Sequence, residues 1–357
     1  MEWAYMIMPI SGVDVFWPGL VIMGLGVGIV GGFIGMGAAW VVTPGLNILG
    51  FPMAFAIGTD MAHIAGKSLI STMRHGKFGN VDYPLGIAML LGTIAGIECG
   101  AQVIMWFEQI GKVDLYVRIL YMGFLFMMAW WIYLDRKKRK EKEVAAEEKG
   151  EKLDKLAGGI EWYKTVHRLK IPPMMHFKVA NIHVSWLVPI GIGYVTGVIA
   201  GILGIGGGLV RMPALIYFVG CPTHIAVGTD LFEVMLSGLY GAVSFTLKGR
   251  TELIAVIIML CGAAVGAQIG AVATKYYAGM GIRFIYGCCV FVAATSIAQK
   301  LIARIYDIPL LDFTSMVWIL AGIGFMMLII MRRFCQGAYK EIQLHREAKA
   351  AKRAAKK

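Results

Sequence analysis

The longest uncharged stretch of the chain, Val15–Thr59, contains no Asp, Glu, Lys or Arg. A helix that crosses a bilayer needs about 20 mostly apolar residues, so this stretch is too long for a single span. Gly and Pro interrupt it at Gly35-Met36-Gly37, at Thr43-Pro44-Gly45 and at Gly50-Phe51-Pro52. We therefore predict three helices within it, near 16–34, 38–50 and 53–74.

The rest of the chain repeats this apolar pattern. Hydrophobic residues make up 58% of the sequence and charged residues only 16%, against about 25% charged residues in soluble globular proteins. Further apolar segments are expected near 84–106, 114–134, 184–203, 207–219, 222–246, 252–273, 281–302 and 312–332. The composition thus predicts an all-α polytopic membrane protein, with the lipid bilayer as its surroundings.

Two stretches carry the whole net charge of +12. Asp135–His183 contributes +5 (13 Lys/Arg against 8 Asp/Glu), and Arg332–Lys357 contributes +7 (9 Lys/Arg against 2 Glu). Basic segments next to apolar helices mark the cytoplasmic side of a membrane. We therefore expect the linker 135–183 and the C-terminal tail in the cytoplasm and the N-terminus outside. No aromatic residues interleave the basic run Arg346–Lys357 at the end of the tail as a base-stacking surface requires, so we expect no nucleic-acid partner.

Metal and cofactor motifs are missing from the sequence. The six cysteines show no CxxC spacing, and His167, His176 and His183 in the linker are spaced too loosely for a metal site. Neither the βαβ context of a dinucleotide fingerprint nor a P-loop Lys-Ser/Thr accompanies the glycine motifs. We also find no catalytic motif of a membrane-embedded enzyme. We expect no cofactor, no metal and no enzymatic activity.

The two halves of the chain resemble each other. One constant shift along the chain places Gly28, Gly32, Gly35, Gly37, Val41, Pro44 and Leu46 on Gly197, Gly201, Gly204, Gly206, Val210, Pro213 and Leu215. After one inserted position, the shift places Pro52, Ala56, Gly58, Thr59 and Asp60 on Pro222, Ala226, Gly228, Thr229 and Asp230. Such self-similarity is the sign of an internal repeat.

Each repeat contains about five helical segments, an odd number, so the two copies are expected to insert with opposite orientation. We predict a first membrane repeat at 1–134, a charged cytoplasmic linker at 135–183 and a second repeat at 184–302. An additional C-terminal transmembrane helix at 303–332 and a basic cytoplasmic tail at 333–357 complete the chain. Inverted repeats with short discontinuous or re-entrant helices are a common plan of secondary transporters, whose substrate site lies between the repeats.

Glycine-rich breaks occupy matching places in the two repeats. Glycine lets backbone N–H groups approach a ligand closely, and a short helix after each break would direct its positive end to the same centre. The breaks therefore suggest an anion site, although tight helix packing through small residues explains the same glycines. Candidate substrate-binding residues here are Gly35, Gly37, Ala38, Gly204, Gly206, Gly207 and Gly208, together with Thr59 and Thr229 of the two Gly-Thr-Asp tripeptides.

Few ionisable residues fall within the apolar segments, and several of them share a helix face. Asp60, His63, Lys67, Ser71 and Arg74 are spaced by three or four residues, and Asp230, Glu233, Ser237, Gly241 and Ser244 occupy the matching face of the second repeat. Ionisable residues at membrane depth are functional candidates because their insertion is costly.

Three roles are open for these residues. Lys67 and Arg211 are candidates to neutralise an anionic substrate, or they form buried salt bridges with Asp60 and Glu233. Asp60, His63, Asp230 and Glu233 are candidates for proton coupling or gating. The two aspartates also suit helix N-caps or hydrogen bonds between the repeats.

These motifs carry a family resemblance. The two segments GGFIGMGAAWVVTPGL and AGILGIGGGLVRMPAL, each followed by Pro and Gly-Thr-Asp, resemble the TauE/SafE sulfite-exporter family over residues 16–302. The short basic loop Arg74–Asp82 fits the same family. The resemblance implies a polytopic permease of the inner membrane for sulfite or small organosulfonate anions such as sulfoacetate. The chain departs from the family in the Gly-Met-Gly-Ala-Ala form of its first motif and in its long charged linker.

Together, these observations predict a secondary transporter that exports sulfite or a small organosulfonate by alternating access, with protons as the coupling ion. The expected partners are a small sulfur-containing anion and the bilayer. The alternatives are a passive anion channel, a permease that imports the same anions, and an exporter of a small carboxylate.

Overall fold

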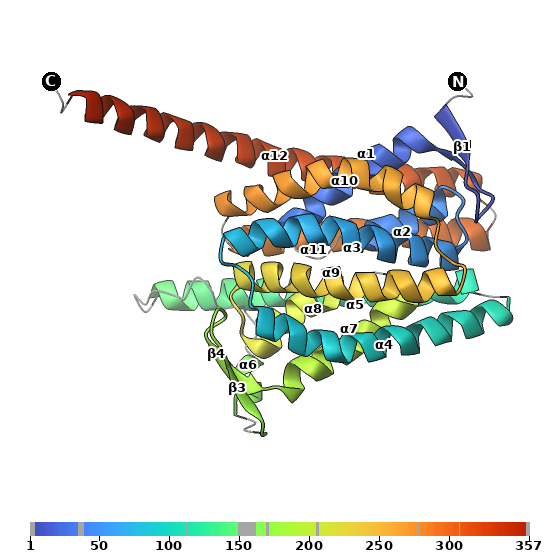
Figure 1. Cartoon of the computed structure of the whole chain (residues 1–357), viewed down its shortest axis with the longest axis horizontal. Coiled ribbons are helices and arrows are strands. Elements are labelled where there is room, and N and C mark those ends of the chain that lie inside the picture. Colours follow the sequence, from blue (N-terminus) through green and yellow to red (C-terminus); the bar gives the residue numbers. More distant parts are fainter. Residues whose placement is uncertain are drawn as a thin grey trace.

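The computed structural model describes residues 4–34, 39–111, 113–148, 162–168, 171–204, 207–277, 279–306 and 308–354. Within these residues the chain forms a bundle of long helices with a short β-hairpin at each end (Figure 1). The first half contains β1 (Tyr5–Ile7), β2 (Asp14–Phe16), α1 (Trp17–Ile34), α2 (Ala39–Ile48), α3 (Met53–Lys77), α4 (Tyr83–Gln109) and α5 (Val113–Glu148). The second half contains α6 (Tyr163–Val166), β3 (Met174–Phe177), β4 (Ile182–Ser185), α7 (Leu187–Leu203), α8 (Gly208–Ala214), η2 (Leu215–Val219), α9 (Thr223–Leu247), α10 (Leu253–Ala273), η3 (Thr274–Tyr276), α11 (Gly279–Ile305) and α12 (Pro309–Ala354).

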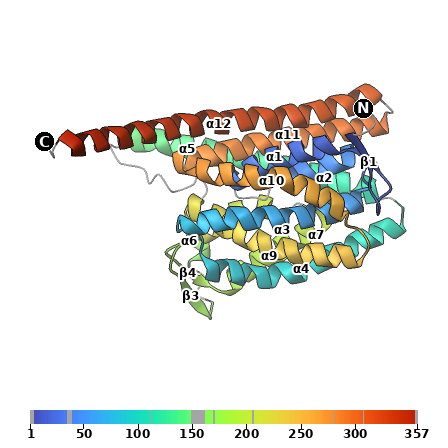
Figure 2. The same cartoon turned by 45° about the horizontal axis from the view of Figure 1, so that its top comes forward.

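Every helical segment expected from the sequence is present, but two helices are longer than expected. Helix α5 continues to Glu148 instead of ending near 134, and α12 continues to Ala354 instead of ending near 332. Both extensions are rich in Lys, Glu and Ala, which are good helix formers, so no residue in them ends the helix where the apolar segment ends. Helix α12 lies along α11 for much of its length and then runs on beyond the bundle (Figure 2).

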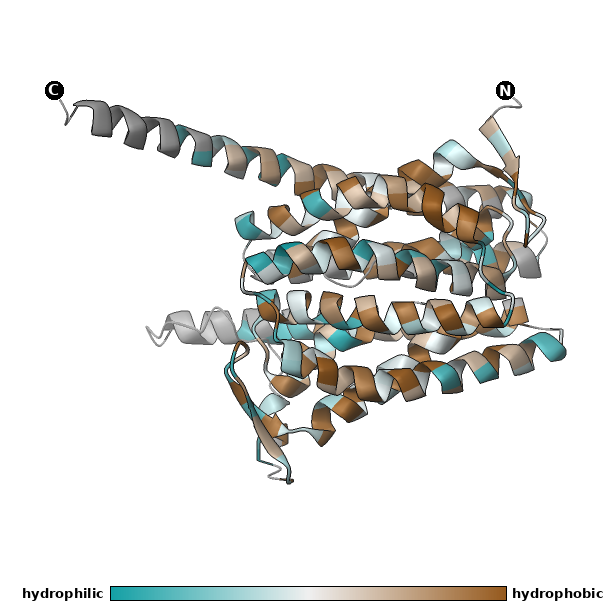
Figure 3. Cartoon of the chain, in the orientation of Figure 1, coloured by the Kyte–Doolittle hydropathy of each residue, from teal (hydrophilic) through white to brown (hydrophobic). Residues whose placement is uncertain are grey.

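Six of the described helices are long and apolar enough to cross a bilayer. They comprise α1, α4 and α9, together with the spans Leu115–Asp135, Leu253–Tyr276 and Pro309–Tyr339. Hydrophobic residues make up most of the length of the bundle helices, whereas hydrophilic residues are more frequent toward the two ends of the bundle (Figure 3). The chain is therefore a multi-pass membrane protein whose long helices run from one polar end of the bundle to the other.

The two β-hairpins were not expected from the sequence. Strand β1 pairs antiparallel with β2, joining Tyr5 to Phe16, and β3 pairs antiparallel with β4, joining Met174 to Ser185. The constant shift that relates the helices after them also places β1 on β3 and β2 on β4. The second hairpin therefore corresponds to the first one, although it lies largely in the range 135–183 that we expected to be only a charged linker.

A buried carboxylate holds the turn of each hairpin. Glu252, before α10, accepts hydrogen bonds through Oε2 from the backbone N–H groups of Ile10 and Ser11, at 2.9 and 3.0 Å. Asp82, before α4, accepts hydrogen bonds through Oδ2 from the N–H groups of Val179 and Ala180, each at 3.0 Å. Since the shift that relates the two Gly-Thr-Asp tripeptides also places Asp82 on Glu252, each half of the chain holds the hairpin of the other half in the same way.

Helix α2 returns the chain to the end of the bundle from which α1 starts. Gly50, just after α2, lies against the side chain of Val13 in the turn before β2. A helix of 10 residues is about 15 Å long, half of the hydrocarbon thickness of a bilayer. Helix α2 is thus too short to cross the membrane alone, and α3 begins at the same end as α1.

Glycines bring helices of the two halves into backbone contact. A Cβ atom added to Gly28 of α1 would lie 2.6 Å from the carbonyl oxygen of Ala263 in α10, and one added to Gly32 would lie 2.6 Å from that of Ala267. A Cβ atom added to Gly100 of α4 would lie 2.5 Å from the carbonyl oxygen of Val198 in α7. Each first helix therefore packs parallel to the fourth helix of the other half, with no room for side chains between them.

Helices α3 and α9 form the centre of the bundle and run antiparallel. Gly238 of α9 lies beside Ala65 of α3, whereas Gly228, nearer the start of α9, lies beside Asn80, just after α3. Figures 1 and 2 show α3 and α9 side by side between the α1–α10 and α4–α7 pairs. The two helices that carry the Gly-Thr-Asp tripeptides therefore meet face to face in opposite directions.

We expect the substitution Gly28→Leu to destabilise the protein, because a side chain there would overlap the backbone of α10. Overpacking typically costs about 1–3 kcal/mol, which thermal unfolding in detergent can measure. Gly123→Leu is the control, since a Cβ atom at Gly123 of α5 meets nothing within 4 Å. Equal melting temperatures for the two variants would contradict the proposed close contact.

The substitution Asp82→Ala should destabilise the protein by about 1–3 kcal/mol, because the N–H groups that donate to Asp82 would lose their partner. Glu108→Ala is a matched control, since Glu108 pairs with Arg250 where both side chains are 32% exposed. Exposed ion pairs contribute about 0–1 kcal/mol. Thermal unfolding of both variants measures the difference, and an unchanged Asp82→Ala protein would exclude a stabilising role for the carboxylate.

Candidate functional site

A stripe of polar side chains lies in the interior of the bundle along α3. Asp60, His63, Lys67 and Ser71 have no solvent-exposed surface in the described structure, as the helical spacing of these residues predicts. Lys67 lies near the middle of the 25-residue helix. Because burying ionisable groups in the membrane is costly, such a stripe is a candidate functional site.

Asp60 is held by Thr43, a residue that also contacts the second half of the chain. Its Oδ2 atom accepts a hydrogen bond of 2.8 Å from the hydroxyl of Thr43, which lies in α2. The same hydroxyl lies 3.3 Å from the carbonyl oxygen of Gly204, the residue that ends α7. The glycine break of the second half therefore meets the Asp60 cluster of the first half. On the other side of the carboxylate, His63 Nδ1 lies 3.6 Å from Asp60 Oδ1.

Several buried polar atoms along α3, from His63 to Thr72, have no hydrogen-bond partner among the described residues. They are Nζ of Lys67, both ring nitrogens of His63, and the hydroxyls of Ser68, Ser71 and Thr72. Buried polar groups in folded proteins are nearly always hydrogen-bonded, so a concentration of such groups on one helix points to a place where a polar ligand binds. An ammonium group that offers three donors suits an anion.

The corresponding cluster of the second half is built around a buried arginine. Arg211 of α8 forms ion pairs with both carboxylates of α9, at 3.2 Å from Asp230 Oδ1 and also with Glu233. Its guanidinium lies within hydrogen-bonding distance of the hydroxyls of Thr196 in α7 (3.4 Å) and Thr93 in α4 (3.5 Å). This cluster therefore joins four helices, α4, α7, α8 and α9.

The charges of the two clusters are placed differently. Val42 of the first half stands at the position of Arg211, and Ser237 of the second half stands at the position of Lys67. Of the two roles that the sequence left open for Arg211, the structure contains the buried salt bridge. Nζ of Lys67, by contrast, has no hydrogen-bond partner among the described residues, Asp60 included. Lys67 is thus the better placed of the two cations to meet a ligand.

Thr59 and Thr229 lie away from these charges. The hydroxyl of Thr59 accepts a hydrogen bond of 3.0 Å from the backbone N–H of Glu252, and the hydroxyl of Thr229 accepts one of 2.9 Å from that of Asp82. Each threonine thus holds the chain just before the fourth helix of the other half. These contacts give both residues a structural role beside the substrate role expected for them.

Only part of the expected glycine site can be located. Gly35, Gly37, Ala38 and Gly206 lie outside the described residues. Gly204 ends α7 with a φ of 71°, and Gly207 precedes α8 with a φ of 73°, a backbone conformation that favours glycine. A Cβ atom at Gly207 would lie 2.5 Å from Nη2 of Arg211, so the guanidinium folds back over the break. Gly208 is the first residue of α8.

Three threonines in the site were missed at the level of sequence. Thr43, Thr93 and Thr196 are buried in apolar helices and contact Asp60 or Arg211. A single threonine in an apolar helix usually bonds to its own backbone, and nothing in the spacing of these residues distinguishes them. Only the packing of α4 on α7, and of α2 on α3, identifies them.

We expect Arg211→Ala to reduce stability by about 3–5 kcal/mol, because it leaves two buried carboxylates without their cation. The triple variant Arg211→Met, Asp230→Asn, Glu233→Gln removes all three charges together and should recover most of that loss. Thermal unfolding in detergent compares the two proteins with the unchanged chain. A single variant as stable as the unchanged chain would show that the ion pairs do not hold the cluster together.

Comparison with known proteins agrees with this architecture. A probable membrane transporter protein of Bacillus subtilis, YunE, is 28% identical over 260 residues, covering 71% of this chain and 86% of the relative. A probable membrane transporter protein of Methanocaldococcus jannaschii is 27% identical over 241 residues, covering 66% of this chain and 74% of the relative. A further B. subtilis protein of that description, YjnA, is 22% identical, covering 77% and 96%. No solved structure matches the chain.

A family model gives the assignment. The model of the sulfite exporter TauE/SafE family matches residues 20–297, which include both glycine breaks and both buried clusters. The match covers most of the chain and ends before α12, the helix without a counterpart in the first half. This chain is therefore a membrane transporter of the sulfite exporter TauE/SafE family.

Proposed function

We propose that the protein is a secondary transporter that exports sulfite or a small organosulfonate, and that Lys67 binds the anion. The observation that carries the proposal is the buried ammonium group of Lys67, which has no hydrogen-bond partner among the described residues and lies near the middle of α3. An anion without its water needs such a charge-assisted donor. Arg211 is a weaker candidate because it already pairs with Asp230 and Glu233.

The hydroxyl of Ser71 lies one turn from Lys67 on the same buried face, and His63 lies one turn away on the other side. His63, Lys67 and Ser71 thus place three hydrogen-bond donors on one helix, which suits the several oxygen atoms of a sulfonate or sulfite group. The glycine breaks would supply backbone N–H groups to the same anion. The charge of the site thus supports an anionic cargo, and the family name supports sulfur as its central atom.

Coupling to protons would use the ionisable groups around the anion. Asp60 lies 3.6 Å from His63, and Asp230 and Glu233 share one arginine, so a proton gained at either place would change the charge balance of a buried cluster. We assign coupling or gating to Asp60, His63, Asp230 and Glu233. The proton gradient across the inner membrane would then drive export of the anion.

Alternating access would arise from movement of one inverted repeat against the other. The antiparallel contact of α3 and α9, and the parallel packing of α1 on α10 and of α4 on α7, support an inverted arrangement of the two halves. In the proposed orientation the β1–β2 hairpin faces the outside, and the β3–β4 hairpin, the charged linker and the C-terminal tail face the cytoplasm.

The first experiment is a thermal-shift panel on purified protein with sulfite, sulfoacetate, taurine, thiosulfate, sulfate and lactate. A ligand at about 100 times its dissociation constant adds about 2.7 kcal/mol to the stability of a folded protein. We expect a sulfur oxyanion to stabilise the protein. Stabilisation by lactate alone would contradict the sulfur substrate and leave the family assignment intact.

The substitution Lys67→Met should reduce transport of the stabilising anion by at least about ten-fold, because a hydrogen bond to a charged group contributes about 1.5–3 kcal/mol. Counterflow in proteoliposomes measures this and separates a carrier, which shows trans-stimulation, from a channel. Lys248→Met is the control, since Lys248 pairs with Glu98 near the end of α9, where its side chain is 24% exposed. The control should keep its transport, and full transport by Lys67→Met would exclude Lys67 from the site.

A further inference from the structure

The buried polar face of α3 continues past Lys67 to the last turn of the helix. Four buried polar side chains follow Lys67, and none of them is more than 7% exposed. They are Ser68, Ser71, Thr72 and His75. The β3–β4 hairpin lies at this end of α3, since Asp82, in the connection to α4, holds its turn. The four side chains therefore lead from the middle of the bundle to the end that we assign to the cytoplasm.

These side chains offer polar atoms that the described part of the protein does not use. The hydroxyls of Ser68, Ser71 and Thr72 and the Nδ1 atom of His75 have no hydrogen-bond partner among the described residues. Nε2 of His75 lies 3.3 Å from the carbonyl oxygen of Gly32 in α1 and donates to it, because a carbonyl oxygen can only accept. Buried polar groups are nearly always hydrogen-bonded, so a row of four such residues indicates a surface that meets a polar ligand.

The second half of the chain shows that helix packing does not require these polar groups. The shift that relates the two Gly-Thr-Asp tripeptides places the four residues on Gly238, Gly241, Ala242 and Phe245 of α9. Gly238 lies beside Ala65 of α3, and Phe245 is completely buried. Since the same fold accepts apolar residues at all four positions of α9, the polar residues of α3 serve a purpose other than packing.

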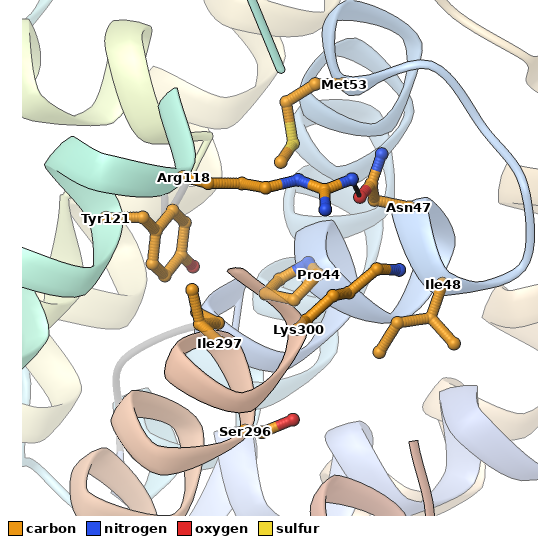
Figure 4. Close-up of a pocket in the computed structure, with 9 residues that line it drawn as sticks. All are labelled: Pro44, Asn47, Ile48, Met53, Arg118, Tyr121, Ser296, Ile297 and Lys300. Carbon is orange, nitrogen blue, oxygen red and sulfur yellow. Dashed lines mark hydrogen bonds between the residues drawn. The ribbon is translucent and has the colours of Figure 1, made fainter. Parts of the chain in front are cut away.

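Polar side chains at the other end of the bundle are bonded to each other. Nη2 of Arg118 donates a hydrogen bond of 2.6 Å to Oδ1 of Asn47 (Figure 4). The cavity that both residues line has a volume of about 20 Å³, room for a water molecule. Ser244, near the end of α9, donates a hydrogen bond of 2.8 Å to Oε2 of Glu98. These contacts hold their groups in place, whereas the row on α3 offers its polar atoms to a ligand.

We propose that Ser68, Ser71, Thr72 and His75 line the path by which the anion passes between the cytoplasmic end of the bundle and Lys67. The inference rests on the proposed function, because the anion is the cargo assigned to Lys67. The hydroxyls donate hydrogen bonds to the oxygens of the anion, and Nδ1 of His75 accepts one from water that accompanies it. All four side chains are buried in the described structure, so the path is closed here and opens when one half of the chain moves against the other.

The test uses single cysteines along α3 and a membrane-impermeant thiol reagent, a methanethiosulfonate that carries a sulfonate group. The six native cysteines are first replaced by alanine or serine. Ser71→Cys and Thr72→Cys, which keep the size of the side chain nearly unchanged, then report on the proposed path. Leu69→Cys is the matched control, since Leu69 lies in the same turn of α3 but faces out of the bundle and is 48% exposed.

In oriented vesicles, Ser71→Cys and Thr72→Cys should react at least about ten-fold faster than Leu69→Cys with reagent added on the side of the β3–β4 hairpin, because a thiol in apolar surroundings is inert. Sulfoacetate bound at Lys67, one turn from Ser71, should slow both reactions. With each rate divided by that of a small free thiol, the sulfonate reagent should react faster than one that carries a quaternary ammonium group. Rates no higher than the control, or a faster reaction with the cationic reagent, would overturn the proposal.

A second variant tests His75 itself. His75→Phe gives α3 the residue that α9 carries at the matching position. It should slow the modification of Ser71→Cys and raise the KM for sulfoacetate, both measured from the side of the β3–β4 hairpin. His176→Phe is the control, because it removes an exposed histidine of that hairpin. An unchanged rate and an unchanged KM in a His75→Phe protein of normal melting temperature would exclude His75 from the path.

Failure of the proposed function gives a different result, since cysteine modification does not depend on which anion the protein carries. If the unchanged protein transports no sulfur anion and sulfoacetate protects neither cysteine, faster modification of Ser71→Cys and Thr72→Cys than of Leu69→Cys still supports the path, for another anion. If the protein does transport a sulfur anion but both cysteines react no faster than the control, the proposed function stands and the path along α3 is overturned.

Discussion

The close approach of α1 to α10 and of α4 to α7 is the constraint on which the rest of the structure depends. Glycines on both partners of each pair let backbones touch, and the two pairs enclose α3 and α9. In lipid, where no hydrophobic effect drives helices together, such contacts and hydrogen bonds between helices are what hold a bundle. The buried charges of α3 and α9 can therefore lie at membrane depth without contact with lipid.

Each half of the chain is completed by the other half. Asp82 and Glu252 each hold the hairpin of the opposite half. Thr59 and Thr229 each hold the chain just before the fourth helix of the opposite half. Gly204 of the second half contacts Thr43 of the first half, beside Asp60. Each half therefore contains hydrogen-bonding groups whose partners belong to the other half. This mutual dependence explains why movement of one half against the other would change the surroundings of both charged clusters together.

The sequence predicted the helices well and the site in part. Apolar length located all the apolar helices but not the short α6 of the linker, and helical spacing placed Asp60, His63, Lys67 and Ser71 on one buried face. It did not predict the hairpins, because their strands are only three or four residues long and the second lies in a charged region. Nor did it predict the hydrogen bonds that Thr59 and Thr229 accept from the chain before α10 and α4, because Gly-Thr-Asp is one motif in sequence while Thr and Asp face different neighbours on a helix.

The sequence by itself determined the membrane class, the internal repeat and the family, because apolar length and residue identity at fixed spacing are properties of the chain alone. Only the tertiary structure decided which charges are paired. Arg211 and Lys67 are both buried cations in apolar segments, yet Arg211 meets Asp230 and Glu233, while Lys67 has no hydrogen-bond partner among the described residues. Arg211 reaches its carboxylates because α8 crosses α9 beside Thr93 of the first half, a contact between residues far apart in the chain. Helix α2 crosses α3 in the first half but carries Val42 in place of Arg211, so it brings no cation to Asp60.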